Sequence, residues 1–143
     1  MSETKSGAEL TSLLNAIQFD AAGLVPVIAQ AQDGGEILMM AWMNRDAVAE
    51  TLTTGRVCYW SRSRQSLWRK GETSGQRQHL IELRLDCDGD CLLAVVEQEG
   101  VACHTGRRSC FFNRAATGNG TWEITSEPLI SPQDLYKPGP SNE

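Results

Sequence analysis

The segments that join the expected strands are short, and this limits the possible folds more than any other property of the chain. Apolar runs cover residues 24–32 and 36–43, and the Asp-Gly-Gly sequence between them is typical of a β-hairpin turn. Two further apolar runs, at 80–86 and 92–98, are separated by only a few residues. Parallel neighbours need a crossover of about a dozen residues or more, usually a helix. The sequence therefore predicts a mainly antiparallel sheet.

Two short helices complete the expected fold. Residues 9–17 carry apolar side chains at helical spacing. A second helix is expected to begin after Asn44, which suits the N-cap position, and to end at Gly55, which suits the C-terminal stop. A short strand is expected at 57–61. We therefore predict an α+β fold with a mainly antiparallel sheet and short helices.

One domain is expected to include the whole chain. Its 143 residues are enough for one hydrophobic core. The core is expected at about 19–112. Residues 113–143 carry few apolar anchors, among them Trp122 and the Leu135-Tyr136 pair, and they contain several prolines and glycines. We predict that this tail is an irregular or edge segment, because it is too short for a second domain.

Composition and charge narrow the function. Hydrophobic residues make up 41% of the chain and charged residues 22%, which is typical of a globular protein. The net charge of -5 opposes nucleic-acid binding except at a local basic patch. There is no basic leader followed by an apolar stretch, and no run of about 18 apolar residues that could span a membrane. We expect a cytoplasmic protein that acts on a small molecule and binds neither nucleic acid nor membranes.

The cysteines indicate a metal site. Four of the five lie within 24 residues, and a reducing compartment would keep them as thiols. Cys87, Cys103 and Cys110 follow the spacing C-x15-C-x6-C, which differs from the paired C-x2-C spacing of a structural zinc finger. A zinc ion held by three thiolates keeps one position for a water molecule and lowers the pKa of that water. Each cysteine taken alone could instead be a small buried residue; Cys58 is expected in the core, and Cys91 is ambiguous.

His104 directly follows one of these cysteines. An imidazole at this position could transfer a proton to or from the metal-bound water or a leaving nitrogen. The alternative is a loop histidine held by hydrogen bonds. The neighbouring thiols favour the catalytic interpretation, so we predict that His104 is a general acid or base.

Three aspartates lie close together in the sequence. In an extended chain Asp86, Asp88 and Asp90 would point to one side, and Cys87 and Cys91 would point to the other. Their mutual repulsion favours a bound cation, and carboxylate oxygens suit Mg²⁺ or Ca²⁺. One alternative is an acidic, solvated turn. Another is an EF-hand loop with Glu97 at its twelfth place, but Cys91 stands where that loop needs glycine.

A basic segment indicates a phosphate-bearing ligand. Residues 56–77 hold six basic side chains and a single acid. Guanidinium groups, hydroxyls and glycine-rich backbone can bind an anion, although the order of a P-loop is absent. Two tryptophans in the segment could stack on a nucleobase. The alternative is a basic solvated loop with two core tryptophans. The predicted substrate-binding residues are Trp60, Arg62, Arg64, Trp68, Lys70, Thr73 and Ser74.

Taken in order, these motifs resemble those of the phosphoribosyl-AMP cyclohydrolases. The resemblance runs from about residue 19 to residue 112. The matching motifs are Met40-Ala-Trp-Met-Asn44, Tyr59-Trp-Ser-Arg-Ser-Arg64, Leu67-Trp-Arg-Lys-Gly-Glu-Thr-Ser-Gly75, Gln78-His79, Asp86-Cys-Asp-Gly-Asp90, Ala102-Cys-His-Thr-Gly106 and Ser109-Cys-Phe111.

The resemblance implies both an activity and an assembly. The activity is the zinc-dependent hydrolysis of 1-(5-phosphoribosyl)-AMP in histidine biosynthesis, in which the N1–C6 bond of the adenine ring opens to give the phosphoribosyl-formimino aminoimidazole carboxamide ribonucleotide. The assembly is an intertwined homodimer with zinc sites at its interface. The implied zinc ligands are Cys87, Cys103 and Cys110, with one of them donated by the other chain, and the implied magnesium ligands are Asp86, Asp88 and Asp90.

The expected mechanism is attack of zinc-bound hydroxide on C6, with His104 carrying the proton as the N1–C6 bond breaks. The ribosyl group on N1 makes the ring cationic and so favours the attack. A hypothesis of another class is a non-catalytic dimer, stabilised by zinc, that binds a nucleotide or RNA through the basic segment. Such a protein would hold its zinc with four protein ligands and would lose affinity steeply with salt.

Overall fold

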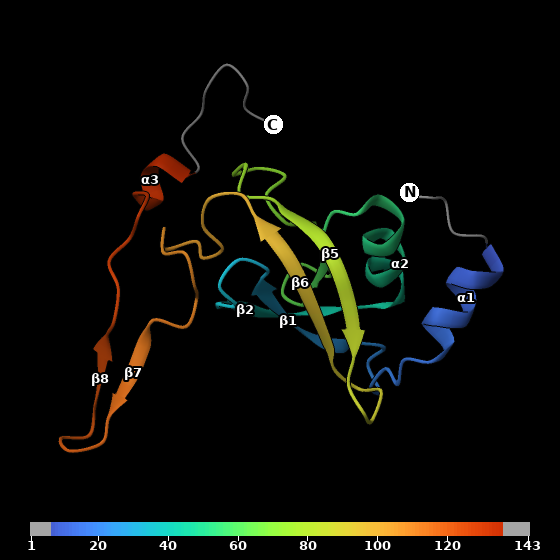
Figure 1. Cartoon of the computed structure of the whole chain (residues 1–143), viewed down its shortest axis with the longest axis horizontal. Coiled ribbons are helices and arrows are strands. Elements are labelled where there is room, and N and C mark those ends of the chain that lie inside the picture. Colours follow the sequence, from blue (N-terminus) through green and yellow to red (C-terminus); the bar gives the residue numbers. More distant parts are fainter. Residues whose placement is uncertain (1–6, 136–143) are drawn as a thin grey trace.

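The computed structural model describes residues 7–135, which form a four-stranded sheet with helices beside it and a hairpin that projects away (Figure 1). The order of the strands in the sheet is β2-β1-β6-β5. Their bounds are β1 (Val25–Ala31), β2 (Ile37–Met43), β5 (Gln78–Leu85) and β6 (Leu92–Gln98). The hairpins β1–β2 and β5–β6 are antiparallel, as the short connections predict.

The central pair of the sheet, β1 and β6, is parallel. Val27 lies opposite Leu92, and Ala31 lies opposite Val96. This pair is an exception to the expected antiparallel order, because its strands are far apart in the sequence. A helix and four further strands lie between them in the chain and provide the crossover that parallel strands require. The prediction of an α+β fold with a mainly antiparallel sheet is confirmed.

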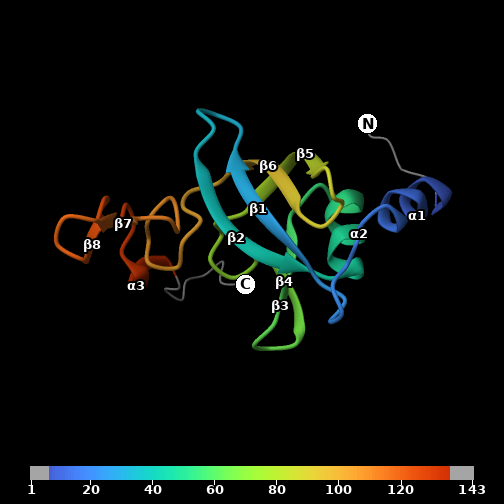
Figure 2. The same ribbon diagram turned by 90° about the horizontal axis from the view of Figure 1, so that it is seen from below.

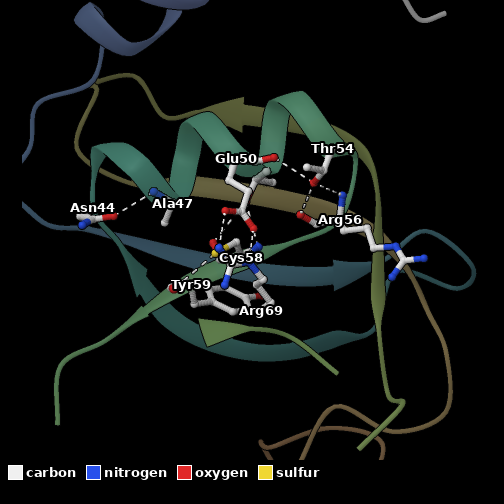
Figure 3. A network of polar contacts seen from close by, with 9 residues as sticks. Asn44, Ala47, Glu50, Thr54, Arg56, Cys58, Tyr59 and Arg69 are labelled. Carbon is white, nitrogen blue, oxygen red and sulfur yellow. Dashed lines mark hydrogen bonds and ion pairs between the residues drawn. The ribbon is translucent and has the colours of Figure 1, made fainter. Parts of the chain in front are cut away.

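Helix α2 (Arg45–Thr54) begins and ends at the predicted residues. The side-chain oxygen of Asn44 accepts a hydrogen bond of 2.8 Å from the backbone N–H of Ala47 (Figure 3). Gly55 adopts the left-handed conformation with φ of 77°, and its N–H donates to the carbonyl of Thr51. Such a C-terminal position favours glycine because its backbone has no Cβ to clash. The first helix, α1 (Gly7–Asn15), begins and ends two residues earlier than the predicted range of 9–17.

One buried hydroxyl fixes strand β3 (Cys58–Ser61) to α2. Thr51 is fully buried, and its Oγ1 accepts a hydrogen bond of 2.9 Å from the N–H of Cys58. The same hydroxyl donates to the carbonyl of Cys58 at 3.2 Å, so a single side chain satisfies both backbone groups. Cys58 itself is 1% exposed and contacts the core, as predicted.

Strand β3 pairs with β4 (Ser66–Arg69), and this hairpin projects from the main sheet (Figure 2). The sequence analysis does not predict β4, because its residues form no run of alternating apolar side chains. The turn between the two strands contains Gln65 with φ of 53°, a conformation that glycine adopts more readily. Composition alone therefore does not indicate this turn.

The predicted irregular tail contains regular structure. Strands β7 (Asn113–Ala116) and β8 (Thr121–Ile124) form an antiparallel hairpin, and a short helix α3 (Pro132–Leu135) follows. The description of this part of residues 113–143 as irregular is therefore wrong. The Asn119-Gly120 pair is a hairpin-turn signal that the sequence analysis does not use, and Gly120 has φ of 74°. Tyr136 and the residues after it lie outside the described residues.

No helix between residues 7 and 135 has the length and the apolar character needed to cross a membrane.

We expect Thr51→Val to lower the free energy of unfolding by about 2–6 kcal/mol, because an unsatisfied buried backbone group costs about 1–3 kcal/mol and both groups of Cys58 would lose their partner. Urea denaturation measures this change. Thr51→Ser keeps the hydroxyl and loses one methyl group, so its expected cost is about 1 kcal/mol. Equal destabilisation by the two variants would show that the hydroxyl does not fix β3 to α2.

Candidate active site

A cavity of about 540 Å³ brings together segments that are distant in the sequence. Strands β2 and β4, the turn at residues 71–75 and the loop after β6 contribute to its wall. The predicted residues that line it are Arg64, Trp68, Lys70, Thr73, Ser74, His104 and Cys110. The cavity therefore joins most of the predicted substrate-binding side chains to the predicted catalytic histidine and one predicted zinc ligand.

Backbone conformation shapes the 71–75 turn. Gly71 has φ of +84°, and a Cβ built on it would lie 2.5 Å from the backbone nitrogen of Arg77. This approach leaves no room for a side chain, so only glycine fits there. The N–H of Gly75 donates to the carbonyl of Gly71 at 2.8 Å and closes the turn. Thr73 and Ser74 thus reach the cavity from a compact turn.

Lys70 brings positive charge to the same wall. Its Nζ lies 5.7 Å from the centre of the Trp68 ring, a distance suited to a cation–π contact. Burial lowers the pKa of Lys70, while negative charge at the neighbouring sulfurs of Cys110 and Cys103 opposes that change. The Trp68 ring also packs against Tyr59 at 5.4 Å, so this tryptophan contributes to the core as well as to the cavity.

Two of the three predicted zinc ligands are neighbours. Cys103 is 5% exposed and Cys110 is partly buried. Burial, followed by the negative charge of Cys103, raises the pKa of Cys110 to about 12. Two adjacent thiols in such surroundings form thiolates readily only beside a cation, and thiolate sulfur is a preferred ligand of zinc. The chemistry of this pair therefore fits a zinc ion.

Backbone hydrogen bonds hold the thiol pair in place. The N–H of Cys103 donates to the carbonyl of Arg107 at 3.1 Å, which closes the turn that carries His104. The N–H of Cys110 donates to the carbonyl of Leu38 at 2.7 Å and fastens the end of the loop to β2. His104 is exposed on this turn.

The segment after β8 packs against the same turn. The carbonyl of Gly106 accepts hydrogen bonds from the N–H groups of Leu129 at 2.8 Å and Ile130 at 3.2 Å. Gly106 has φ of +89°, and a Cβ on it would lie 1.7 Å from the carbonyl oxygen of Ile130. Residues 129 and 130 therefore hold the turn from outside, and the contact requires glycine at 106.

Cys87 precedes β6, whereas both members of this thiol pair follow it (Figure 1 shows the strand). It is exposed in the turn between β5 and β6. Strand β6 has seven residues and so spans about 23 Å at about 3.3 Å per residue. Within one chain the structure thus brings Cys103 and Cys110 together and leaves Cys87 apart.

The three aspartates converge as predicted, but in a turn rather than in an extended strand. Ligand oxygens of Asp86, Asp88 and Asp90 lie within 4.8 Å of one another, and all three residues are exposed. The side chain of Asp86 also accepts a hydrogen bond of 3.0 Å from the N–H of Asp90, which helps to form the turn. The EF-hand alternative is excluded because Glu97 belongs to strand β6.

Two predicted substrate-binding residues do not line the cavity. Trp60 is partly buried in β3, and the guanidinium of Arg62 lies 4.7 Å from the centre of the Trp42 ring. The apolar part of the wall is not predicted from the sequence, because isolated methionines and leucines carry no functional signal. These additional lining residues are Met39, Met40, Leu67 and Ala102.

Comparison with known proteins identifies the family. A family model for phosphoribosyl-AMP cyclohydrolase matches residues 39–112. A Rhodospirillum rubrum protein of that name is 60% identical over 136 residues, which cover 95% of this chain and 94% of that protein. Proteins of the same name from Alkalilimnicola ehrlichii and Granulibacter bethesdensis are both 63% identical, over 90% and 89% of this chain and 89% and 98% of their own lengths. The chain belongs to the phosphoribosyl-AMP cyclohydrolase family of enzymes.

Proposed function

We propose that this chain is a zinc-dependent hydrolase that opens the N1–C6 bond of 1-(5-phosphoribosyl)-AMP in histidine biosynthesis. The observation that carries the proposal is the shared cavity of His104, Cys110, Lys70 and the 71–75 turn. One predicted zinc ligand, the predicted proton carrier and candidate phosphate-binding groups line this cavity, and the proposed reaction needs all three kinds of group. The names of the relatives supply the substrate.

The substrate is an anion that contains a purine. Arg64 and Lys70 would attract its phosphates, and the hydroxyls of Thr73 and Ser74 would donate hydrogen bonds to them. The face of Trp68 could stack on the base, an interaction worth about 1–3 kcal/mol per base in proteins that bind single-stranded nucleic acids. These side chains would place the adenine ring near the thiol pair.

Cys103 and Cys110 of one chain, with Cys87 of a second copy, would hold the zinc ion. When bound, zinc would supply an activated water as the nucleophile for C6. His104 follows Cys103 directly and is exposed on its turn, so it could transfer the proton to the ring nitrogen as the N1–C6 bond breaks. Asp86, beside Cys87, and its two neighbouring aspartates would hold Mg²⁺.

A homodimer would complete this site. Since Cys87 lies far from the thiol pair in one chain, a second copy would have to bring it there. Large apolar side chains around the β7–β8 hairpin support such an assembly, because burial of apolar surface drives association. These residues and their exposed fractions are Phe111 (61%), Trp122 (71%), Ile124 (58%) and Leu129 (71%).

We expect the purified protein to convert phosphoribosyl-AMP to the ring-opened product, a change that absorbance follows. Cys103→Ala removes a ligand and should abolish both zinc binding, measured by metal analysis, and turnover. Cys58→Ala is a matched control, since Cys58 is buried in the core rather than in the cavity, and it should retain zinc. Full activity of a zinc-free Cys103→Ala enzyme would refute the zinc assignment.

His104→Ala should keep its zinc and lose about 10²–10⁴-fold in kcat, the usual contribution of general acid–base catalysis. Steady-state kinetics at several pH values would measure the loss. A decrease of less than about tenfold would exclude His104 as the proton carrier.

Mixing inactive variants would test the shared zinc site. Cys87→Ala and Cys103→Ala should each be inactive alone. After unfolding and refolding together, half of the dimers would pair the two variants, and each such dimer would have one intact site. The mixture should therefore regain about a quarter of the wild-type activity, as two-fold symmetry requires. An inactive mixture that contains mixed dimers, identified by differential tagging, would contradict donation of Cys87 from a second copy.

A further inference from the structure

The side chain of Gln76 joins the two loops that form the cavity. Its Oε1 accepts a hydrogen bond of 2.9 Å from the N–H of Val101, and its Nε2 donates to the carbonyl of Ser74 at 3.1 Å. The N–H of Gln76 also donates to the hydroxyl of Ser74 at 3.2 Å. One carboxamide thus connects the 71–75 turn to the loop just before Cys103.

The carboxamide of Gln76 occupies the space that a side chain at position 100 would need. A Cβ on Gly100 would lie 1.7 Å from Oε1 of Gln76, so any side chain there would displace the amide. Gly100 also has φ of +68°, which L-residues rarely adopt. The contact between Gln76 and the loop therefore depends on a residue without a side chain.

A second glutamine fixes the base of the same loop. Gln98 Nε2 lies 2.9 Å from the carbonyl oxygen of Glu99, and its Oε1 accepts a hydrogen bond of 2.9 Å from Gln78. Gln78 is fully buried and accepts a hydrogen bond of 2.7 Å from the hydroxyl of Tyr59. The start of the loop is thus anchored in the core. Gln76 is the member of this network that also reaches the carbonyl of Ser74 in the 71–75 turn.

We infer that Gln76 is a positioning residue, which sets the distance between the phosphate-binding turn and the loop that carries Cys103 and His104. The inference rests on the proposed function. When the contact through Gln76 is lost, the turn still carries its phosphate-binding groups and the loop still carries its zinc ligands. Substrate and zinc would therefore still bind. The reacting groups would then be misaligned, and a displacement of about 1 Å can cost about 10²-fold in rate. The expected effect is therefore on kcat rather than on KM.

Gln76→Met has a similar length and makes neither hydrogen bond. We expect kcat per folded enzyme to fall by about 10–100-fold, with KM changed by less than about threefold and the zinc content unchanged. Gln76→Glu keeps an acceptor for the N–H of Val101 and should lose less. A matched control is Gln30→Met, which loses a comparable hydrogen bond from Gln30 to the carbonyl of Gly35 and should keep its kcat.

A double-mutant cycle would separate positioning from stability. Gly100→Ala should lower kcat because its methyl group displaces the carboxamide of Gln76. In the Gln76→Ala background there is no carboxamide to displace, so Gly100→Ala should change kcat by less than about twofold. The strain of alanine at a positive φ is present in both backgrounds, so it cancels when the two effects of Gly100→Ala on kcat are compared.

Additive losses in kcat in the double-mutant cycle would overturn the inference. A Gln76→Met enzyme whose activity falls only in proportion to its folded fraction, measured by denaturation, would also overturn it. A wild-type enzyme that does not open phosphoribosyl-AMP would overturn the proposed function instead. The two failures are therefore distinguishable.

Discussion

The parallel pairing of β1 with β6 is the constraint on which the site depends. It places β6 at the centre of the sheet, next to a strand from the other half of the chain. The two ends of β6 then carry different chemistry: the aspartate turn with Cys87 precedes the strand, and the loop with Cys103 follows it. The seven residues of β6 hold these ends about 23 Å apart. Within one chain, side chains at the two ends of the strand are therefore too far apart to bind the same metal ion.

Local signals predict most of the sheet and helix α2 from the sequence. Alternating or continuous apolar runs give the four main strands, and Asn44 and Gly55 give the ends of α2, because caps act through nearby backbone groups. The parallel pair was not predictable in this way, because it depends on residues that are distant in sequence. Strand β3 was predicted at 57–61, but its partner β4 and the β7–β8 hairpin are mostly polar or exposed, so hydrophobic periodicity does not detect them.

The sequence was enough to predict which kinds of side chain form the site. Their arrangement in space could be predicted only in part. Lys70, Thr73, Ser74 and His104 line one cavity, and the sequence analysis assigns them to one substrate. Convergence of the aspartates was predicted for the wrong reason, because they meet through a turn rather than along one face of a strand. The role of Gln76 could not be predicted, since it follows from contacts with Ser74 and Val101 that the fold creates.

The packing of residues 129 and 130 on Gly106 affects where the C-terminal boundary of the functional domain should be placed. The family model ends at residue 112, yet the turn between Cys103 and Arg107 takes two of its hydrogen bonds from this later segment. The boundary of the family model and the boundary of the structural support for this turn therefore differ. Protein engineers who shorten or graft this domain would need to keep the segment that reaches Ile130, although it lies beyond the recognised motif.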